Sequence, residues 1–220
     1  MKDFVKKYGH AWVFLYALIY MPWFMWLEKT VTTEYHVVHI ALDDKIPFCE
    51  YFIIPYYLWF LLVPVVFAYE FFYSKKEFYR MCILMFTGMT IFLIVCTLWH
   101  NGLNLRSQIR FHDNICSTLV RRLHKADTST NVLPSMHVFN TLGCLIALFE
   151  SKGLKKKRGL ILTLSSLLSV FILMSTLLLK QHSVVDVAAA VILAAILYGI
   201  VYLPYHFFPE TESEETAAKT

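Results

Sequence analysis

The chain has 220 residues and a formal net charge of +4, and 58% of its residues are hydrophobic while only 16% are charged. This balance excludes an ordinary soluble domain, in which about 25% of residues are charged. The positive charge does not indicate nucleic-acid binding, because it lies beside long apolar segments, where it reports membrane topology.

Six mostly apolar segments follow one another along the chain, and each predicts a membrane-spanning helix. They cover residues 8–27, 51–73, 78–99, 134–149, 159–179 and 183–205. The fourth is short, as expected if its first turn lines a site instead of contacting lipid. The predicted fold class is therefore all-α, a polytopic membrane protein with six transmembrane helices. One integral membrane domain is expected over residues 1–208, and a disordered acidic tail over residues 209–220.

The polar segments between these helices predict the topology. Basic residues precede the first segment and fill the turns at 74–77 and 152–158. An even number of crossings puts these sites on one side, which the positive-inside rule makes the cytoplasm, together with both termini. The connector 28–50, the loop 100–134 and the turn 180–183 then face outward. The loop 100–134 is nevertheless basic, which indicates that its arginines have a functional role.

A polar island at 179–187 carries the first chemical signal. Asp186 heads the sixth apolar segment, and an ionisable residue there indicates function. His182 lies four residues earlier, so on a helix the two side chains share a face. Asp186 can then hold one ring nitrogen of His182 and leave the other free as a base or nucleophile.

Two further clusters are expected on the same outer face. Pro134 suits the first turn of a helix, whose free N–H groups favour a phosphate. Ser135 adds a hydroxyl donor, and His137 lies in the same turn. Arg106 stands at the start of the long loop. Two histidines, an arginine and a helix N-terminus fit phosphoryl transfer, with one histidine attacking phosphorus and the other protonating the leaving oxygen.

These residues resemble the type 2 phosphatidic acid phosphatase superfamily, in the branch that includes inositol-phosphotransferase-like proteins. The second signature of the family, P-S-G-H, matches residues 134–137 with Met136 in place of glycine. The third, S-R-x5-H-x3-D, matches Ser175, His182 and Asp186, and Arg106 represents the first, K-x6-R-P. The resemblance covers residues 78–205. It implies a core helical bundle, a metal-independent mechanism without a cofactor, His182 as the nucleophile, Asp186 as its orienting partner and His137 as the general acid.

The chain departs from the signatures at three positions. Trp99 stands where the first signature has lysine, Ser107 where it has proline, and Thr176 where the third has arginine. Lys180 is expected to replace one of the missing phosphate-binding cations, beside Arg106 and Ser135. Arg110 and Lys125 are further candidates.

The function expected is that of a lipid phosphate phosphatase at the outer face of the cell membrane, working through a phosphohistidine. A phosphoinositol-type head-group transferase, in which an alcohol replaces water, is the enzymatic alternative. A proton-coupled transporter that uses Asp186 is the non-enzymatic alternative. No metal is expected, because H-x3-D supplies only two ligands on one helix. The isolated His100, His112, His124 and His206 are interpreted as interfacial residues.

Overall fold

The computed structural model describes residues 7–207, without the side chains of Gln108 and Lys156, and is built almost entirely of helices. The expected tail at 209–220 lies outside the described residues. The long elements are η1 (Gly9–Tyr16), α2 (Ala17–Thr30), α4 (Ile53–Tyr73), α5 (Lys75–Leu98), α7 (Met136–Glu150), α8 (Arg158–Leu178) and α9 (Val184–Val201). The short ones are β1 (His36–Val37), α3 (Ala41–Lys45), η2 (Glu50–Phe52), β2 (Asn101–Gly102), η3 (Arg106–Gln108), α6 (Ile115–Ala126), η4 (Lys155–Lys157) and α10 (Leu203–Phe207).

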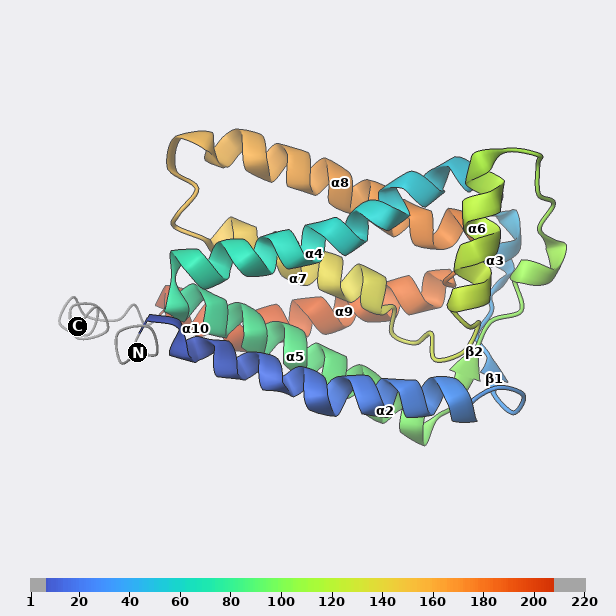
Figure 1. Ribbon diagram of the computed structural model, residues 1–220, viewed down its shortest axis with the longest axis horizontal. Helices are drawn as coiled ribbons and strands as arrows, with labels where there is room; N and C mark the ends of the chain where they lie inside the picture. The colour runs from blue at the N-terminus through green and yellow to red at the C-terminus, as the bar shows by residue number, and fades with distance from the viewer. Residues whose placement is uncertain (1–6, 208–220) are drawn as a thin grey trace.

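Helix α7 is the centre of the bundle. The long helices lie side by side along the longest axis, and α7 packs against α4, α5, α8 and α9 (Figure 1). Phe139 of α7 is fully buried, and a Cβ added to Gly88 of α5 would lie 2.0 Å from its ring. Only glycine therefore lets these two helices approach so closely.

Five helical segments in the described part of the chain are long and apolar enough to cross a membrane. They are Gly9–Thr30, Glu50–Tyr73, Lys75–Leu98, Arg158–Leu178 and Val184–Phe207. Large apolar side chains such as Leu18, Leu160 and Ile200 are exposed on their outer faces, as lipid contact requires. The predicted all-helical, multi-pass class is confirmed at this level. Helix α7, expected as the fourth of six spans, has only 15 residues and is shorter than the other five.

The two ends of the bundle differ in what covers them. One end carries the turn at Ser74 and the basic segment with η4. The other carries α3, α6, β1 and β2, with α6 lying across the helix ends (Figure 1). Strands β1 and β2 pair in parallel, and Gly102 of β2 also bridges to Thr130. The connector 31–49 and the loop 99–135 are thus joined over the end where α7 and α9 begin.

Candidate active site

His182 lies in a turn between α8 and α9 rather than on the helix, which corrects the expected helical pairing with Asp186. The backbone N–H groups of Gln181 and His182 both donate to the Thr176 carbonyl, at 3.0 Å each. Ser183 is the N-cap of α9, and its backbone N–H donates to Asp186 Oδ2 at 2.8 Å. This capping box, not helical periodicity, brings His182 over Asp186.

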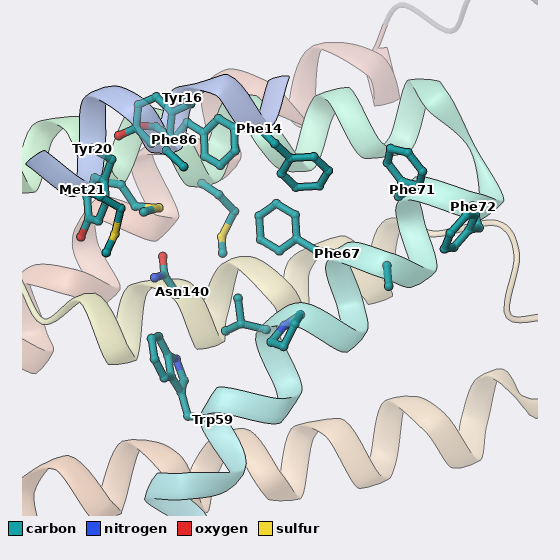
Figure 2. A pocket seen from close by; sticks show the side chains of 16 residues that line it. Phe14, Tyr16, Tyr20, Met21, Trp59, Phe67, Phe71, Phe72, Phe86 and Asn140 are labelled. Atoms are coloured by element: carbon teal, nitrogen blue, oxygen red, sulfur yellow. The ribbon is translucent and has the colours of Figure 1, made fainter. Parts of the chain in front are cut away.

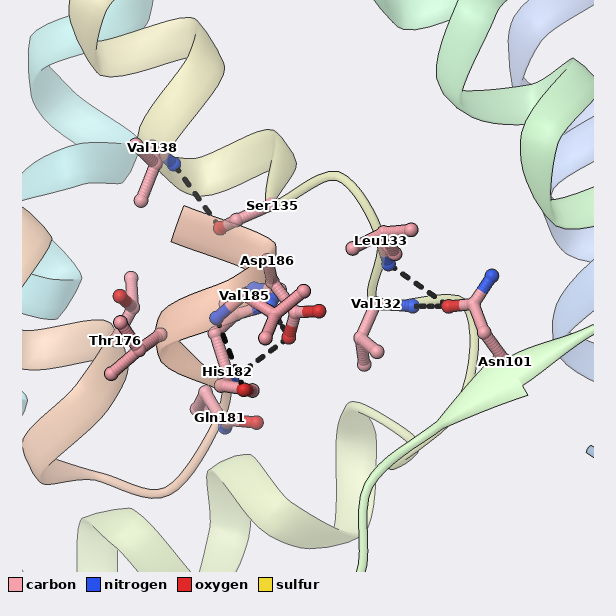
Figure 3. A network of polar contacts seen from close by, with 12 residues as sticks. Asn101, Val132, Leu133, Ser135, Val138, Thr176, Gln181, His182, Val185 and Asp186 are labelled. Carbon is pink, nitrogen blue, oxygen red and sulfur yellow. Dashed lines mark hydrogen bonds and ion pairs between the residues drawn. The ribbon is translucent and has the colours of Figure 1, made fainter. Parts of the chain in front are cut away.

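The expected contact between these two side chains is present. Nδ1 of His182 lies 3.4 Å from Oδ2 of Asp186, which is fully buried (Figure 3). Nε2 of His182 makes no hydrogen bond within the described residues, and Oδ1 of Asp186 has no partner there either. The carboxylate therefore orients one ring nitrogen and leaves the other available for chemistry.

His137 lies in the first turn of α7, with its ring centroid 5.7 Å from that of His182. Helix α7 begins at Met136, and Ser135 is the N-cap, whose hydroxyl oxygen accepts the Val138 N–H at 3.4 Å. Pro134 therefore precedes the cap instead of opening the helix as expected. The structure brings together His137, His182 and Asp186, the three residues that the sequence indicated as catalytic.

A buried amide fixes the loop that leads into α7. Oδ1 of Asn101, at the start of β2, accepts the backbone N–H groups of Val132 and Leu133 at 2.9 Å each (Figure 3). Asn101 is fully buried, so these bonds act in a low-dielectric interior. The small sheet therefore holds the approach to His137.

Two residues of α4 that the sequence did not single out complete the surroundings of His137. The Tyr56 hydroxyl lies 2.8 Å from Nε2 of His137 and 3.4 Å from Oδ2 of Asp127. The Trp59 ring centroid lies 4.5 Å from that of His137. Tyr56 and Trp59 are three residues apart and so share a helix face, but in an aromatic-rich span that spacing does not distinguish them from lipid-facing side chains.

Arg106 reaches the site through Gln181, the residue before His182. Its guanidinium donates to the Gln181 side-chain oxygen and to the backbone carbonyls of Asp127 at 2.7 Å and Thr128 at 3.1 Å. Nε of Arg106 and Nε2 of Gln181 are buried without a hydrogen-bond partner among the described residues. These two nitrogens are donors that an anion would satisfy.

Burial shifts the pKa values of three ionisable residues in the long loop. Burial raises the pKa of the Asp127 carboxyl, and the nearby Arg106 guanidinium partly offsets this effect. Burial likewise lowers the pKa of Arg106, against the influence of Asp127. His124, on α6, has its pKa lowered to about 4 by burial and by Arg106, and its Nε2 lies 3.1 Å from the Leu179 carbonyl. His124 is therefore neutral at pH 7 and contacts the turn that carries His182.

Two of the expected phosphate-binding residues have other contacts. Ser135 is fully buried and acts as the cap of α7. Nζ of Lys180 donates to the carbonyls of Asp43 at 2.8 Å and Ile46 at 2.6 Å, and burial lowers its pKa. Lys180 thus joins α3 and the residue that follows it to the turn that carries His182. The structure does not place the Lys180 ammonium group beside the histidines.

Asp43 is a third residue that the sequence did not single out. Its Oδ2 lies 2.7 Å from the Ser183 hydroxyl, and its Oδ1 accepts the Val184 N–H at 2.8 Å. It is buried, and it caps a helix that begins 141 residues later in the chain. No local pattern in the sequence signals such a long-range cap.

The assembled site pairs a carboxylate-oriented histidine with a second histidine and with unpartnered N–H donors, a set suited to attack on a phosphorus centre. Among the described residues, no group of three or more His, Cys, Asp and Glu side chains is placed to hold a metal ion. No family model matches the chain, and no curated protein or solved structure is significantly similar to it.

Proposed function

We propose that this protein is a membrane enzyme that removes phosphate from a lipid phosphate, in the manner of the type 2 phosphatidic acid phosphatases. The observation that carries the proposal is the placement of His137 and His182, with ring centroids 5.7 Å apart and Asp186 behind His182. Two rings at this separation can contact the same phosphoryl group. One can then attack while the other transfers a proton.

In the first step, Nε2 of His182 attacks phosphorus, and the bond from phosphorus to the lipid oxygen breaks. His137, in its protonated form, gives a proton to that oxygen, so the lipid leaves as an alcohol. Asp186 stabilises the positive charge that develops on the His182 ring. The enzyme is left as a phosphohistidine with a neutral His137.

In the second step, a water molecule attacks the phosphohistidine while His137 accepts its proton. The nitrogen–phosphorus bond breaks, inorganic phosphate leaves, and both histidines return to their starting forms. The unpartnered Nε of Arg106 and amide nitrogen of Gln181 are proposed to donate to the phosphate oxygens. These two donors are proposed to replace the lysine and arginine of the family signatures, which this chain lacks, in binding the phosphate.

The proposal includes the orientation in the cell membrane. Helix α7 is taken as a sixth, shorter crossing, which leaves both termini in the cytoplasm. The basic segments at 75–76 and 155–158 lie at the end of the bundle opposite the histidines. The positive-inside rule then makes the site extracytoplasmic.

Phosphate release from dioleoyl phosphatidic acid by the purified protein tests the proposal. His182→Ala and His137→Ala should each lower the rate by about 10²–10⁴-fold. His206→Ala is the matched control, because His206 pairs with Glu150 at 3.1 Å in the opposite half of the bundle, and it should act as wild type. Wild-type rates in His182→Ala and His137→Ala would contradict the assignment of these two histidines.

Trapping the intermediate separates the competing functions. Acid-labile labelled phosphate on His182 supports the enzyme, and proton-coupled flux without a phosphoenzyme supports a transporter instead. Added inositol distinguishes the two enzymes: labelled phosphate on inositol indicates a transferase, and labelled inorganic phosphate alone indicates hydrolysis.

A further inference from the structure

An apolar cavity of about 600 Å³ lies beside the candidate active site, between η1 and α2 on one side and α4, α5 and α7 on the other (Figure 2). Its wall is almost wholly aromatic and aliphatic. Trp59, Val63 and Phe67 line it from α4, and Met85 and Phe86 line it from α5. Its volume falls within the range of sites that hold small-molecule ligands.

Two polar side chains in this apolar wall lack partners. Asn140 of α7 is 6% exposed, and its Oδ1 has no hydrogen-bond partner among the described residues. The same holds for Nε1 of Trp59. Both side chains line the cavity, and Figure 2 shows Asn140 projecting from α7 towards α2. Unsatisfied buried polar groups are costly, so this pair indicates a missing ligand with hydrogen-bonding atoms.

The cavity adjoins the histidine pair through Trp59. The Trp59 ring that lines it also contacts the His137 ring, with centroids 4.5 Å apart. Asn140 follows His137 by three residues on α7, which places it about 4.5 Å deeper along the helix axis. Trp59 and Asn140 are therefore the lining residues through which a lipid with its phosphate at His137 and its chain in the cavity would pass.

The shape of the cavity suits a hydrocarbon chain. Its lining on α4 extends from Trp59 to Phe72, about 20 Å along the helix. Six of its lining residues are exposed on the apolar outer surface, namely Phe14, Ala17, Met21, Pro64, Ala68 and Phe72. A chain can thus enter from the bilayer and remain in an apolar environment.

We propose that this cavity binds the acyl chain of the substrate and that Trp59 and Asn140 form hydrogen bonds with the lipid backbone next to the phosphate. This inference rests on the proposed function and narrows its substrate class. The ligand expected is a lipid that has two kinds of group within a few bonds of the phosphate: an oxygen that accepts from Nε1 of Trp59, and a hydroxyl or amide N–H that donates to Oδ1 of Asn140. A sphingoid or monoacylated glycerol backbone carries both. A polyprenyl phosphate has only hydrocarbon there and would leave both side chains unsatisfied.

Selectivity between two lipid phosphates of similar chain length tests the inference. The ratio of kcat/KM for ceramide 1-phosphate to that for geranylgeranyl phosphate should fall by about tenfold in Asn140→Leu, because ceramide carries a hydroxyl and an amide N–H that can donate to Oδ1 of Asn140. Dioleoyl phosphatidic acid, whose ester carbonyls can accept from Trp59 but cannot donate to Oδ1 of Asn140, should lose less kcat/KM in this variant than ceramide 1-phosphate. Ser169→Ala is the matched control, because Ser169 of α8 also has a buried, unpartnered hydroxyl but does not line the cavity. Its ratio should equal that of wild type.

Binding of radiolabelled ceramide, which has no phosphate, separates this inference from the proposed function. In His182→Ala protein the lipid should bind, and adding Asn140→Leu or the cavity-filling Ala68→Phe should raise Kd by about tenfold or more. Lipid binding that both cavity variants weaken, together with no phosphate release by wild type, would contradict the proposed phosphatase activity but support the lipid site.

Thermal unfolding tests whether misfolding accounts for a loss of lipid selectivity or binding in Asn140→Leu. Lipid-free Asn140→Leu should unfold at the wild-type temperature or above, because it removes an unpartnered buried amide. Unchanged selectivity and unchanged Kd in both cavity variants would overturn the inference, and so would a lowered unfolding temperature in Asn140→Leu with no change in selectivity.

Discussion

The backbone N–H of Ser135 donates to the backbone carbonyl of Asp186 at 3.1 Å. This bond joins the segment that leads to His137 with the first turn of the helix behind His182. Both segments are buried, so the contact is shielded from water. The backbone therefore fixes the separation of the two segments that carry the histidines.

Asp186→Asn should lower the rate of phosphate release by about 10²–10⁴-fold while the protein still folds. Asparagine keeps an oxygen for the Ser183 N–H, but it removes the charge that stabilises the His182 imidazolium. Turnover and the thermal unfolding temperature should be measured together. Full activity in this variant would remove Asp186 from the mechanism.

Tyr56→Phe should reduce kcat by about tenfold, because it removes the 2.8 Å hydrogen bond to His137 and leaves the ring less well oriented. Tyr57→Phe is the matched control, since Tyr57 is an exposed neighbour with no hydroxyl hydrogen bond among the described residues. Steady-state kinetics on both variants decide the point. Equal kcat values would show that Tyr56 serves only packing.

Asp43→Ala should lower the free energy of unfolding by about 1–3 kcal/mol, because it leaves the Ser183 hydroxyl and the Val184 N–H without their acceptor at the start of α9. Asp44→Ala is the control one residue along. Asp44 is half exposed and pairs with His39, so its loss should change stability by less than about 0.5 kcal/mol. Thermal or denaturant unfolding in detergent measures both, and similar losses would contradict the capping role.

Acidification should destabilise the protein partly through His124. Its pKa is about 4 in the folded protein, against the ordinary value of 6.5 expected for the unfolded chain. Between these values the unfolded chain binds more protons, so stability falls as the pH falls from 6.5 towards 4. His124→Gln should lose less stability over this window than wild type. Unfolding temperatures measured at pH 7 and pH 4.5 check this, and parallel losses would refute it.

The sequence by itself determined the helical, multi-pass class and the position of each long helix to within three residues, because long apolar runs have few alternatives in a bilayer. It also indicated His137, His182 and Asp186, since a carboxylate in an apolar helix is costly enough to be informative. Those three residues lie together in the structure.

The tertiary structure decided what surrounds them. Tyr56 and Asp43 lie 81 and 140 residues from their partners His137 and Ser183, and no local pattern encodes such contacts. Lys180, which is next to the site in sequence, instead directs its ammonium group to the carbonyls of Asp43 and Ile46. Local periodicity and composition fix where helices form, whereas hydrogen-bond partners across the bundle depend on how loops fold over the helix ends.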